Sequence, residues 1–257
     1  MATSGAEGQS EINSAMQSEG QPVLIVAALK RELAAIARDR SPALALLDTG
    51  EGPRNAERAL RAWLDEHQAR AVINVGLAGA LSASLEAGDI VIAREIRGRN
   101  CLFDATVSPL FQTAARLSHV RIGTAVTVDE IVCKATDKRR LVEAAGVNET
   151  AWVDMESTAI AAVCDELQVP YLIVRAISDR FDEDLPVDFN RCRDASGRVS
   201  SLRVVQAALA RPRAFKGLLE LKRRADLCAG NLASFIRQLL REMMNDELKR
   251  KRKADYQ

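Results

Sequence analysis

Apolar and polar positions divide the chain into short apolar runs that alternate with segments of helical periodicity. A continuous apolar run bounded by turn residues predicts a strand that is buried on both faces. Such runs span residues 23–28, 43–47, 71–76, 89–93, 121–128 and 169–177. Because helix-like segments separate them, the pattern predicts an α/β fold, with one domain built on a mostly parallel central mixed sheet flanked by helices.

The C-terminal part has a different pattern, since one helical period continues over about residues 212–244. Its apolar positions alternate in steps of three and four, at Leu218, Leu221, Ala225, Cys228, Leu232, Phe235 and Leu239. We expect a long helix that packs on the flank of the domain, and a dimerising or partner-binding helix is the alternative. Residues 1–21, rich in Gly, Ser, Gln and Glu, predict a disordered leader. Residues 22–244 are then the domain, and 245–257 a basic tail.

The composition narrows the choice of partners. Lys and Arg number 36 against 35 Asp and Glu, so the net charge of +1 gives no global attraction to nucleic acid or to a membrane surface. Five scattered cysteines without a C-x-x-C spacing, and only two histidines, argue against a disulfide framework, a Cys–His pair and a zinc site. No apolar run reaches the roughly 20 residues that a membrane helix needs. We therefore expect a cytoplasmic protein without stable membrane association that acts on a small molecule.

Three carboxylates follow predicted strands or lie where strand ends are expected to converge, which is where parallel sheets place their sites. Glu32 comes just after the first strand, Glu156 begins a helix, and Asp179 ends the run at 169–177. Each alone is equally well explained as a helix N-cap. Their joint occurrence at strand ends points to a shared site.

Four segments carry a family resemblance: residues 23–33 (VLIVAALKREL), 72–92 (VINVGLAGALSASLEAGDIVI), 153–161 (VDMESTAIA) and 169–179 (VPYLIVRAISD). In order and spacing they resemble the nucleoside phosphorylase superfamily. Within it, the chain looks most like the methylthioadenosine/S-adenosylhomocysteine nucleosidases and related hopanoid-pathway phosphorylases. The resemblance covers much of residues 22–185, and its last two segments together are the specific part.

The resemblance implies a role for each acid. Asp179 matches the general acid that protonates the purine at N7, and Ser178 helps to orient it. Glu156 matches the residue that grips the ribose 2′- and 3′-hydroxyls, Glu32 the residue that activates the attacking water, and Met155 the residue that packs against the sugar. By the same resemblance, relatives are dimers or hexamers, so a homo-oligomer is expected.

Further contacts to the nucleoside are expected from Gly76, Leu77, Ala78 and Val153. We interpret the glycine segment as a sharp turn that ends the third strand and lets backbone approach the substrate. The chemistry fits this inventory, because breaking an N-glycosidic bond needs a carboxylic acid to protonate the departing base and a carboxylate to orient the ribose. The reaction needs neither a metal nor an organic cofactor.

Two departures leave the substrate and the nucleophile open. Leu77 stands where the nucleosidases usually have Ser or Thr, and residues 126–132 (VTVDEIV) replace their purine-holding segment and resemble that of the hopanoid-pathway phosphorylases. Glu32 stands where a phosphorylase would carry arginine, which favours water over phosphate. Against this, the glycine turn at 50–54 opens a helix and could hold phosphate.

We therefore expect hydrolysis of a 5′-modified adenosine such as 5′-methylthioadenosine or S-adenosylhomocysteine. Phosphorolysis of a purine nucleoside or of a larger adenosyl (hopanoid-type) nucleoside is the alternative. A non-catalytic nucleoside-binding module is the second alternative.

Overall fold

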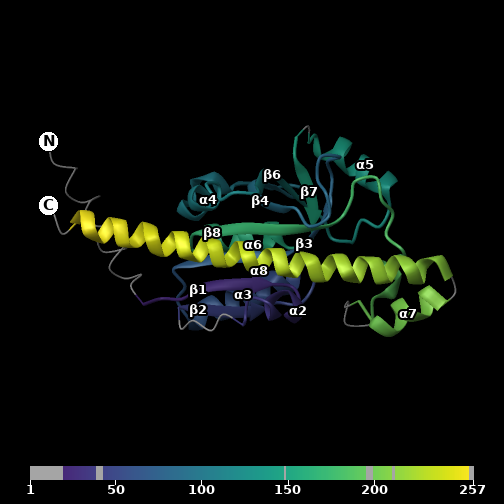
Figure 1. Cartoon of the computed structure of the whole chain (residues 1–257), viewed down its shortest axis with the longest axis horizontal. Helices are drawn as coiled ribbons and strands as arrows, with labels where there is room; N and C mark the ends of the chain where they lie inside the picture. The colour runs from purple at the N-terminus through teal and green to yellow at the C-terminus, as the bar shows by residue number, and fades with distance from the viewer. Residues whose placement is uncertain (1–19, 39–42, 148, 195–198, 210–211, 255–257) are drawn as a thin grey trace.

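A computed structural model describes residues 20–38, 43–147, 149–194, 199–209 and 212–254 of the chain. Its eight described strands form one sheet (Figure 1). Their bounds are β1 Val23–Ala27, β2 Leu44–Asp48, β3 Ala71–Ala80, β4 Ile90–Arg97, β5 Leu102–Asp104, β6 Val120–Thr127, β7 Ala151–Asp154 and β8 Tyr171–Asp179. Most of the pairings are parallel, while β3 with β7, β4 with β5 and β4 with β8 are antiparallel. The predicted mostly parallel mixed sheet is confirmed.

Five of these strands close on themselves. β3 pairs with β8, β8 with β4, β4 with β6, β6 with β7, and β7 returns to β3. β1 and β2 extend this ring from β3, and β5 extends it from β4. A closed ring brings the ends of strands that are distant in the sequence to one rim.

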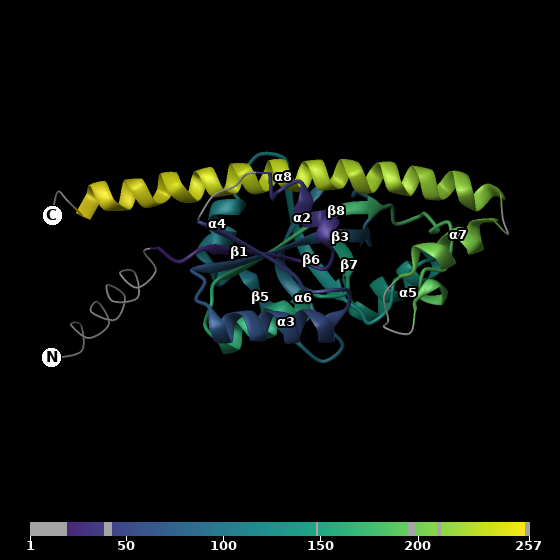
Figure 2. The ribbon, with the colours of Figure 1, turned by 90° about the horizontal axis from the view of Figure 1, so that it is seen from below.

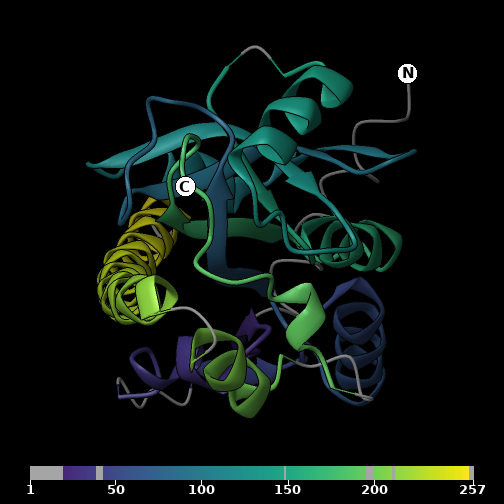
Figure 3. The same cartoon turned by 90° about the vertical axis from the view of Figure 1, so that its right-hand side faces the viewer.

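Helices cover the sheet on opposite sides. The described helices are α2 Lys30–Ala34, α3 Pro53–Glu66, α4 Pro109–Ala114, α5 Ala135–Ala145, α6 Ser157–Glu166, α7 Ser201–Leu209 and α8 Pro212–Ala254. α3 and α6 pack against each other, and α8 lies along β8. Figures 2 and 3 show α8 on one side of the strands and α3 on the other. The sheet is therefore enclosed, which explains why its strands are apolar on both faces.

The long C-terminal helix packs on the flank, as its apolar stripe predicts. Cys228, Leu232, Phe235 and Leu239 are buried in the same core as β1, β3 and β8. The helix differs from the prediction in length, because it continues to Ala254 instead of ending near residue 244. The first basic residues of the expected tail are thus helical. Within the described residues, no helix is both long and apolar enough to span a membrane.

One sequence prediction about the sheet is wrong, and two short strands were missed. The expected turn at Gly76, Leu77 and Ala78 is wrong, because β3 continues as a strand to Ala80 and pairs with β8 along this stretch. The short strands β5 and β7 were not predicted at all. The predicted disordered leader falls almost wholly on residues 1–19, outside the described residues.

Candidate active site

The three predicted acids follow the ends of β1, β7 and β8, which are the neighbours of β3 in the sheet. Glu32 is on α2, which begins three residues after β1 ends. Asp179 is the last residue of β8, and Glu156 is the N-cap of α6, directly after β7. Because β1, β7 and β8 all border β3, their ends meet around the second half of that strand. The sequence prediction that these acids share one site is therefore consistent with the topology.

Glu32 is buried and held by backbone amides. Its Oε2 accepts a hydrogen bond from the Leu29 amide at 2.9 Å, and its Oε1 lies 3.4 Å from the Leu77 amide. Burial raises the pKa of Glu32, and the Leu29 amide and the Arg175 guanidinium offset part of that rise. A carboxyl with a raised pKa is a better proton acceptor than an exposed one, as a water-activating base requires.

Glu156 is joined to the glycine turn that precedes α3. Its Oε1 accepts a hydrogen bond from the Gly52 amide at 2.8 Å. Gly52 has a φ of 93°, a left-handed conformation that suits glycine and aims this amide at the carboxylate. Removal from water raises the pKa of Glu156 to about 7, and the neighbouring Asp154 carboxylate adds to the rise. The amide that a phosphate would use at this turn is thus occupied by a side chain of the protein itself.

A buried ion pair anchors this side of the site. The Arg175 guanidinium lies 3.0 Å from Asp154 Oδ2, and both side chains are almost fully buried. Arg175 also donates to Asn74 Oδ1 at 2.6 Å and to Ser157 Oγ at 3.0 Å. Asp154 Oδ1 in turn accepts from the Ser157 amide at 3.2 Å, at the first turn of α6. The network fixes the start of α6 and with it the position of Glu156.

Asp179 is held on both carboxylate oxygens. Ser178 Oγ donates to Oδ1 at 2.6 Å, and the Lys138 ammonium lies 2.5 Å from Oδ2. Gly79 on β3 leaves room for this carboxyl, since a Cβ there would stand 2.9 Å from Oδ2. Ser178 is the extra residue of a bulge in β8, because Ala78 pairs with Ile177 and Gly79 with Asp179. The bulge turns the end of β8 and places the carboxyl against Gly79.

The remaining predicted contacts line the same region. Leu77 supplies the amide near Glu32, the Ala78 carbonyl lies 3.2 Å from Ser178 Oγ, and Gly76 lies beside Glu32. Val153 packs against Gly79. Met155 is half-buried, and its sulfur lies 3.6 Å from a guanidinium nitrogen of Arg193. Their expected contacts to a nucleoside stay predictions.

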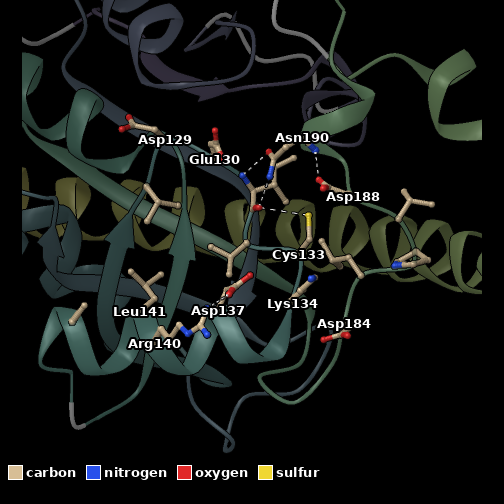
Figure 4. A pocket seen from close by; sticks show the side chains of 17 residues that line it. Asp129, Glu130, Cys133, Lys134, Asp137, Arg140, Leu141, Asp184, Asp188 and Asn190 are labelled. Atoms are coloured by element: carbon tan, nitrogen blue, oxygen red, sulfur yellow. Dashed lines mark hydrogen bonds and ion pairs between the residues drawn. The ribbon is translucent and has the colours of Figure 1, made fainter. Parts of the chain in front are cut away.

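A cavity of about 820 Å³ lies near the Asp179 end of the site, since Cys133, which lines the cavity, interacts electrostatically with Asp179. One wall is the segment from Val128 to Lys134 that leads into α5, and the opposite wall runs from Asp184 to Asn190 after β8 (Figure 4). The Asn190 side chain ties the walls together, because its amide bonds both backbone polar groups of Ile131. None of the three acids lines this cavity, so the cavity is separate from the site that they form.

Comparisons with known proteins show the family and the fold of the chain. A family model described as the phosphorylase superfamily matches residues 40–210. The chain belongs to the phosphorylase superfamily.

Its relatives carry more specific names. A 5′-methylthioadenosine/S-adenosylhomocysteine nucleosidase from Shewanella oneidensis is 30% identical over 179 residues, which cover 61% of this chain and 75% of the relative. The protein of that name from Shewanella pealeana is 29% identical, with 61% and 77% covered.

Solved structures share the fold of this phosphorylase superfamily member. The nucleosidase of that name from Helicobacter pylori, in complex with an inhibitor, aligns with a TM-score of 0.66 at 16% identity over 87% of this chain and 99% of the other. Futalosine hydrolase from Helicobacter pylori aligns with a TM-score of 0.65 at 15% identity, again over 87% and 99%. At such identities the likeness shows the fold, which agrees with the predicted fold class.

Sequence reasoning missed three residues that the structure brings into the site. Arg175 had a visible signal, since it is a lone charge inside an apolar strand and therefore needs a buried partner. Asp154 directly follows an apolar pair but was read only as part of the motif. Lys138 had no signal, because it lies in a run of charged residues on α5 that is typical of an exposed helix face.

Proposed function

We propose that this protein hydrolyses the N-glycosidic bond of a 5′-modified adenosine, such as 5′-methylthioadenosine or S-adenosylhomocysteine. The observation that carries the proposal is the meeting of three carboxylates, Glu32, Glu156 and Asp179, at one rim of the sheet. The curated relatives named for this activity support the same substrate class.

The proposed roles follow from the positions of the acids along β3. Glu32 lies beside Gly76 and Asp179 beside Gly79, which are three residues apart on this strand. At about 3.3 Å per residue, the two acids are separated by roughly 10 Å along β3. They can therefore act at the two ends of one nucleoside, with Glu32 at the ribosyl carbon and Asp179 at the base.

The reaction requires charge of opposite sign at these ends. As the bond between C1′ and the purine breaks, the ribosyl group becomes cationic and the base becomes anionic. Glu156 would accept hydrogen bonds from both ribose hydroxyls, Glu32 would take a proton from the attacking water, and the Asp179 side would deliver a proton to N7. Water supplies the hydroxyl group that ends on C1′.

Water is favoured over phosphate by the contacts of the glycine turn. Its Gly52 amide already binds Glu156, and the Glu51 carboxylate of the same turn accepts from the Val199 amide at 3.1 Å. A phosphate entering here would face Glu156, Glu51 and Glu32, all of the same sign.

The test is base release from a panel of adenosine derivatives, with and without phosphate. We expect adenine and a free sugar at equal rates in both conditions, and Asp179→Asn to lower kcat by about 10²- to 10⁴-fold. Strict dependence on phosphate with formation of a ribose 1-phosphate would establish phosphorolysis instead. An Asp179→Asn variant that turns over normally would refute the assignment of the acid.

We also propose that the protein is a cytoplasmic homo-oligomer, as its resemblance to dimeric and hexameric relatives implies. Apolar side chains that remain exposed, among them Leu102, Val107 and Phe215, support an interface. A mass from light scattering equal to that of one 28.0 kDa chain would contradict the oligomer.

A further inference from the structure

Lys138 is the residue in this site whose position is hardest to explain by folding alone. It lies on α5 between the half-buried Asp137 and the exposed Arg139, yet none of its side chain is exposed. Burying an ammonium group costs free energy unless a charged partner and hydrogen bonds compensate for the lost water. Lys138 has both, because its Nζ lies 2.5 Å from Asp179 Oδ2 and also donates to the Arg180 carbonyl.

This contact changes what Asp179 can do. With Ser178 on one oxygen and Lys138 on the other, Asp179 is a carboxylate whose two oxygens are both engaged. A general acid must carry a proton, and in this contact the hydrogen lies on the lysine, which donates it to Asp179 Oδ2.

We propose that Lys138 is the positioning residue that stores this proton and passes it through Asp179 to the departing base. The inference rests on the proposed function, because it describes how that reaction is completed. As the bond from C1′ to the purine breaks, its electron pair stays on the purine. Nζ of Lys138 first gives a proton to Oδ2 of Asp179, and the carboxylic acid formed in this way passes that proton to purine N7. Lys138 is left as a neutral amine and recovers a proton from water after the base departs.

The other groups packed around this pair do not replace the lysine. Cys133, from the segment before α5, and Cys228, on α8, both interact electrostatically with Asp179. Burial raises the pKa of the Cys133 thiol and raises that of Cys228 to about 11, so both stay neutral and hold their protons. Asp184 accepts a hydrogen bond from the Ala135 amide at the start of α5, so it does not serve as a proton donor there. Among the described residues, Lys138 is the cation that forms an ion pair with Asp179.

A pair of substrates separates proton supply from simple structural support. 5′-Methylthioadenosine has a leaving group that needs a proton, whereas 4-nitrophenyl β-D-ribofuranoside releases a stable phenolate that needs none. We expect Lys138→Met to lower kcat for the first substrate by about 10²- to 10⁴-fold and to change kcat for the second by less than about threefold. The pH profile of the remaining activity should move to lower pH, because Asp179 must then take its proton from the solvent.

Two further variants complete the design. Lys138→Arg keeps the positive charge, but a guanidinium does not release its protons in proteins, so we expect it to stay as impaired as Lys138→Met on the adenosine substrate. Lys138→Arg also serves as a second variant in case Lys138→Met does not fold. Thermal unfolding measures whether each variant is folded. Arg139→Met removes a neighbouring exposed cation from the same helix and should behave as wild type.

Several outcomes would overturn the inference. If Lys138→Met slows both substrates equally, or if Lys138→Arg restores kcat, the lysine only supports the carboxylate. If Lys138→Met is normal on both, it has no part in the reaction. In each of these cases the wild-type protein still releases adenine, so the proposed function stands. A wild-type protein that cleaves neither substrate refutes both proposals together.

Discussion

Replacing Glu156 by glutamine should make the protein more stable and less active, and the gain in stability should depend on pH. The wild-type carboxyl has its pKa raised from an ordinary 4.5 to about 7, chiefly because it is removed from water. Between these two values the folded protein keeps a proton that the unfolded chain releases. Stability therefore falls as pH rises through this window. Glutamine does not titrate, and its amide oxygen can still accept from the Gly52 amide.

The magnitude follows from the two pKa values. At about 1.36 kcal/mol for each pH unit, ionising the buried carboxyl costs about 3 kcal/mol at pH 8. At pH 5 most of that cost is absent, and the expected advantage of Glu156→Gln is about 1 kcal/mol. With a urea dependence of about 3 kcal/mol per molar, the midpoint should move by about 1 M at pH 8.

Urea unfolding of the wild type, Glu156→Gln and a control between pH 5 and 8.5 measures this directly. Glu143→Gln, an exposed carboxyl on α5, is the matched control and should follow the wild type at each pH. In the same preparations kcat/KM for 5′-methylthioadenosine should fall by about 10²-fold in Glu156→Gln, because charge-assisted hydrogen bonds to the ribose hydroxyls are lost. A constant difference in stability across the pH range would refute the reasoning, since the gain would then not come from the carboxyl's ionisation.

Three further changes test other parts of the site. Glu32→Gln should lower kcat by about 10²- to 10⁴-fold in activity assays, and an unchanged kcat would show that Glu32 is not the base. Because burial raises the pKa of Glu32, the variant should also be more stable than the wild type above neutral pH in urea unfolding. Gly79→Ala places a Cβ 2.9 Å from Asp179 Oδ2 and should cost about 1–3 kcal/mol with loss of activity, whereas Gly230→Ala, which meets nothing within 4 Å on α8, should be neutral or stabilising in thermal unfolding. Arg175→Met leaves the Asp154 carboxylate buried without its partner and should lower the free energy of unfolding by about 3–5 kcal/mol in chemical denaturation. A smaller loss in the double variant with Asp154→Asn would confirm that the two residues are coupled, and an equal loss would contradict it.

The sequence predicted the elements whose signal is local. The apolar runs located six strands, and the glycine turn at 50–54 located the start of α3, where Pro53 suits a first helical position. The strands β5 and β7 were missed because three or four residues are too few to show a period. The turn predicted at Gly76 failed for another reason. Glycine permits a turn without requiring one, and at Gly76 the strand continues, with room for a Cβ in ordinary contact with Glu32 and Arg175.

The closed ring of strands was beyond prediction because it depends on pairing between distant segments. β4 runs antiparallel to β8, with Val91 opposite Arg175, and nothing in either segment specifies that neighbour. The same distance hides Lys138 from the sequence. Its partner Asp179 is 41 residues away, and a lysine in a charged helical run indicates exposure unless the fold places a carboxylate beneath it.

In the proposed mechanism, the distribution of charge around the site suits the cleavage of a glycosidic bond. Around the ribose end lie Glu32, Glu156 and Asp154, with Arg175 as the partner of one of them. At the proposed base end Asp179 and Lys138 form an ion pair of balanced charge, which we propose as the source of the proton. The two ends therefore differ as the proposed reaction requires. Carboxylates face the ribosyl cation, and the proposed proton donor faces the leaving base. Because burial fixes these groups before substrate arrives, they need no reorganisation when charge develops.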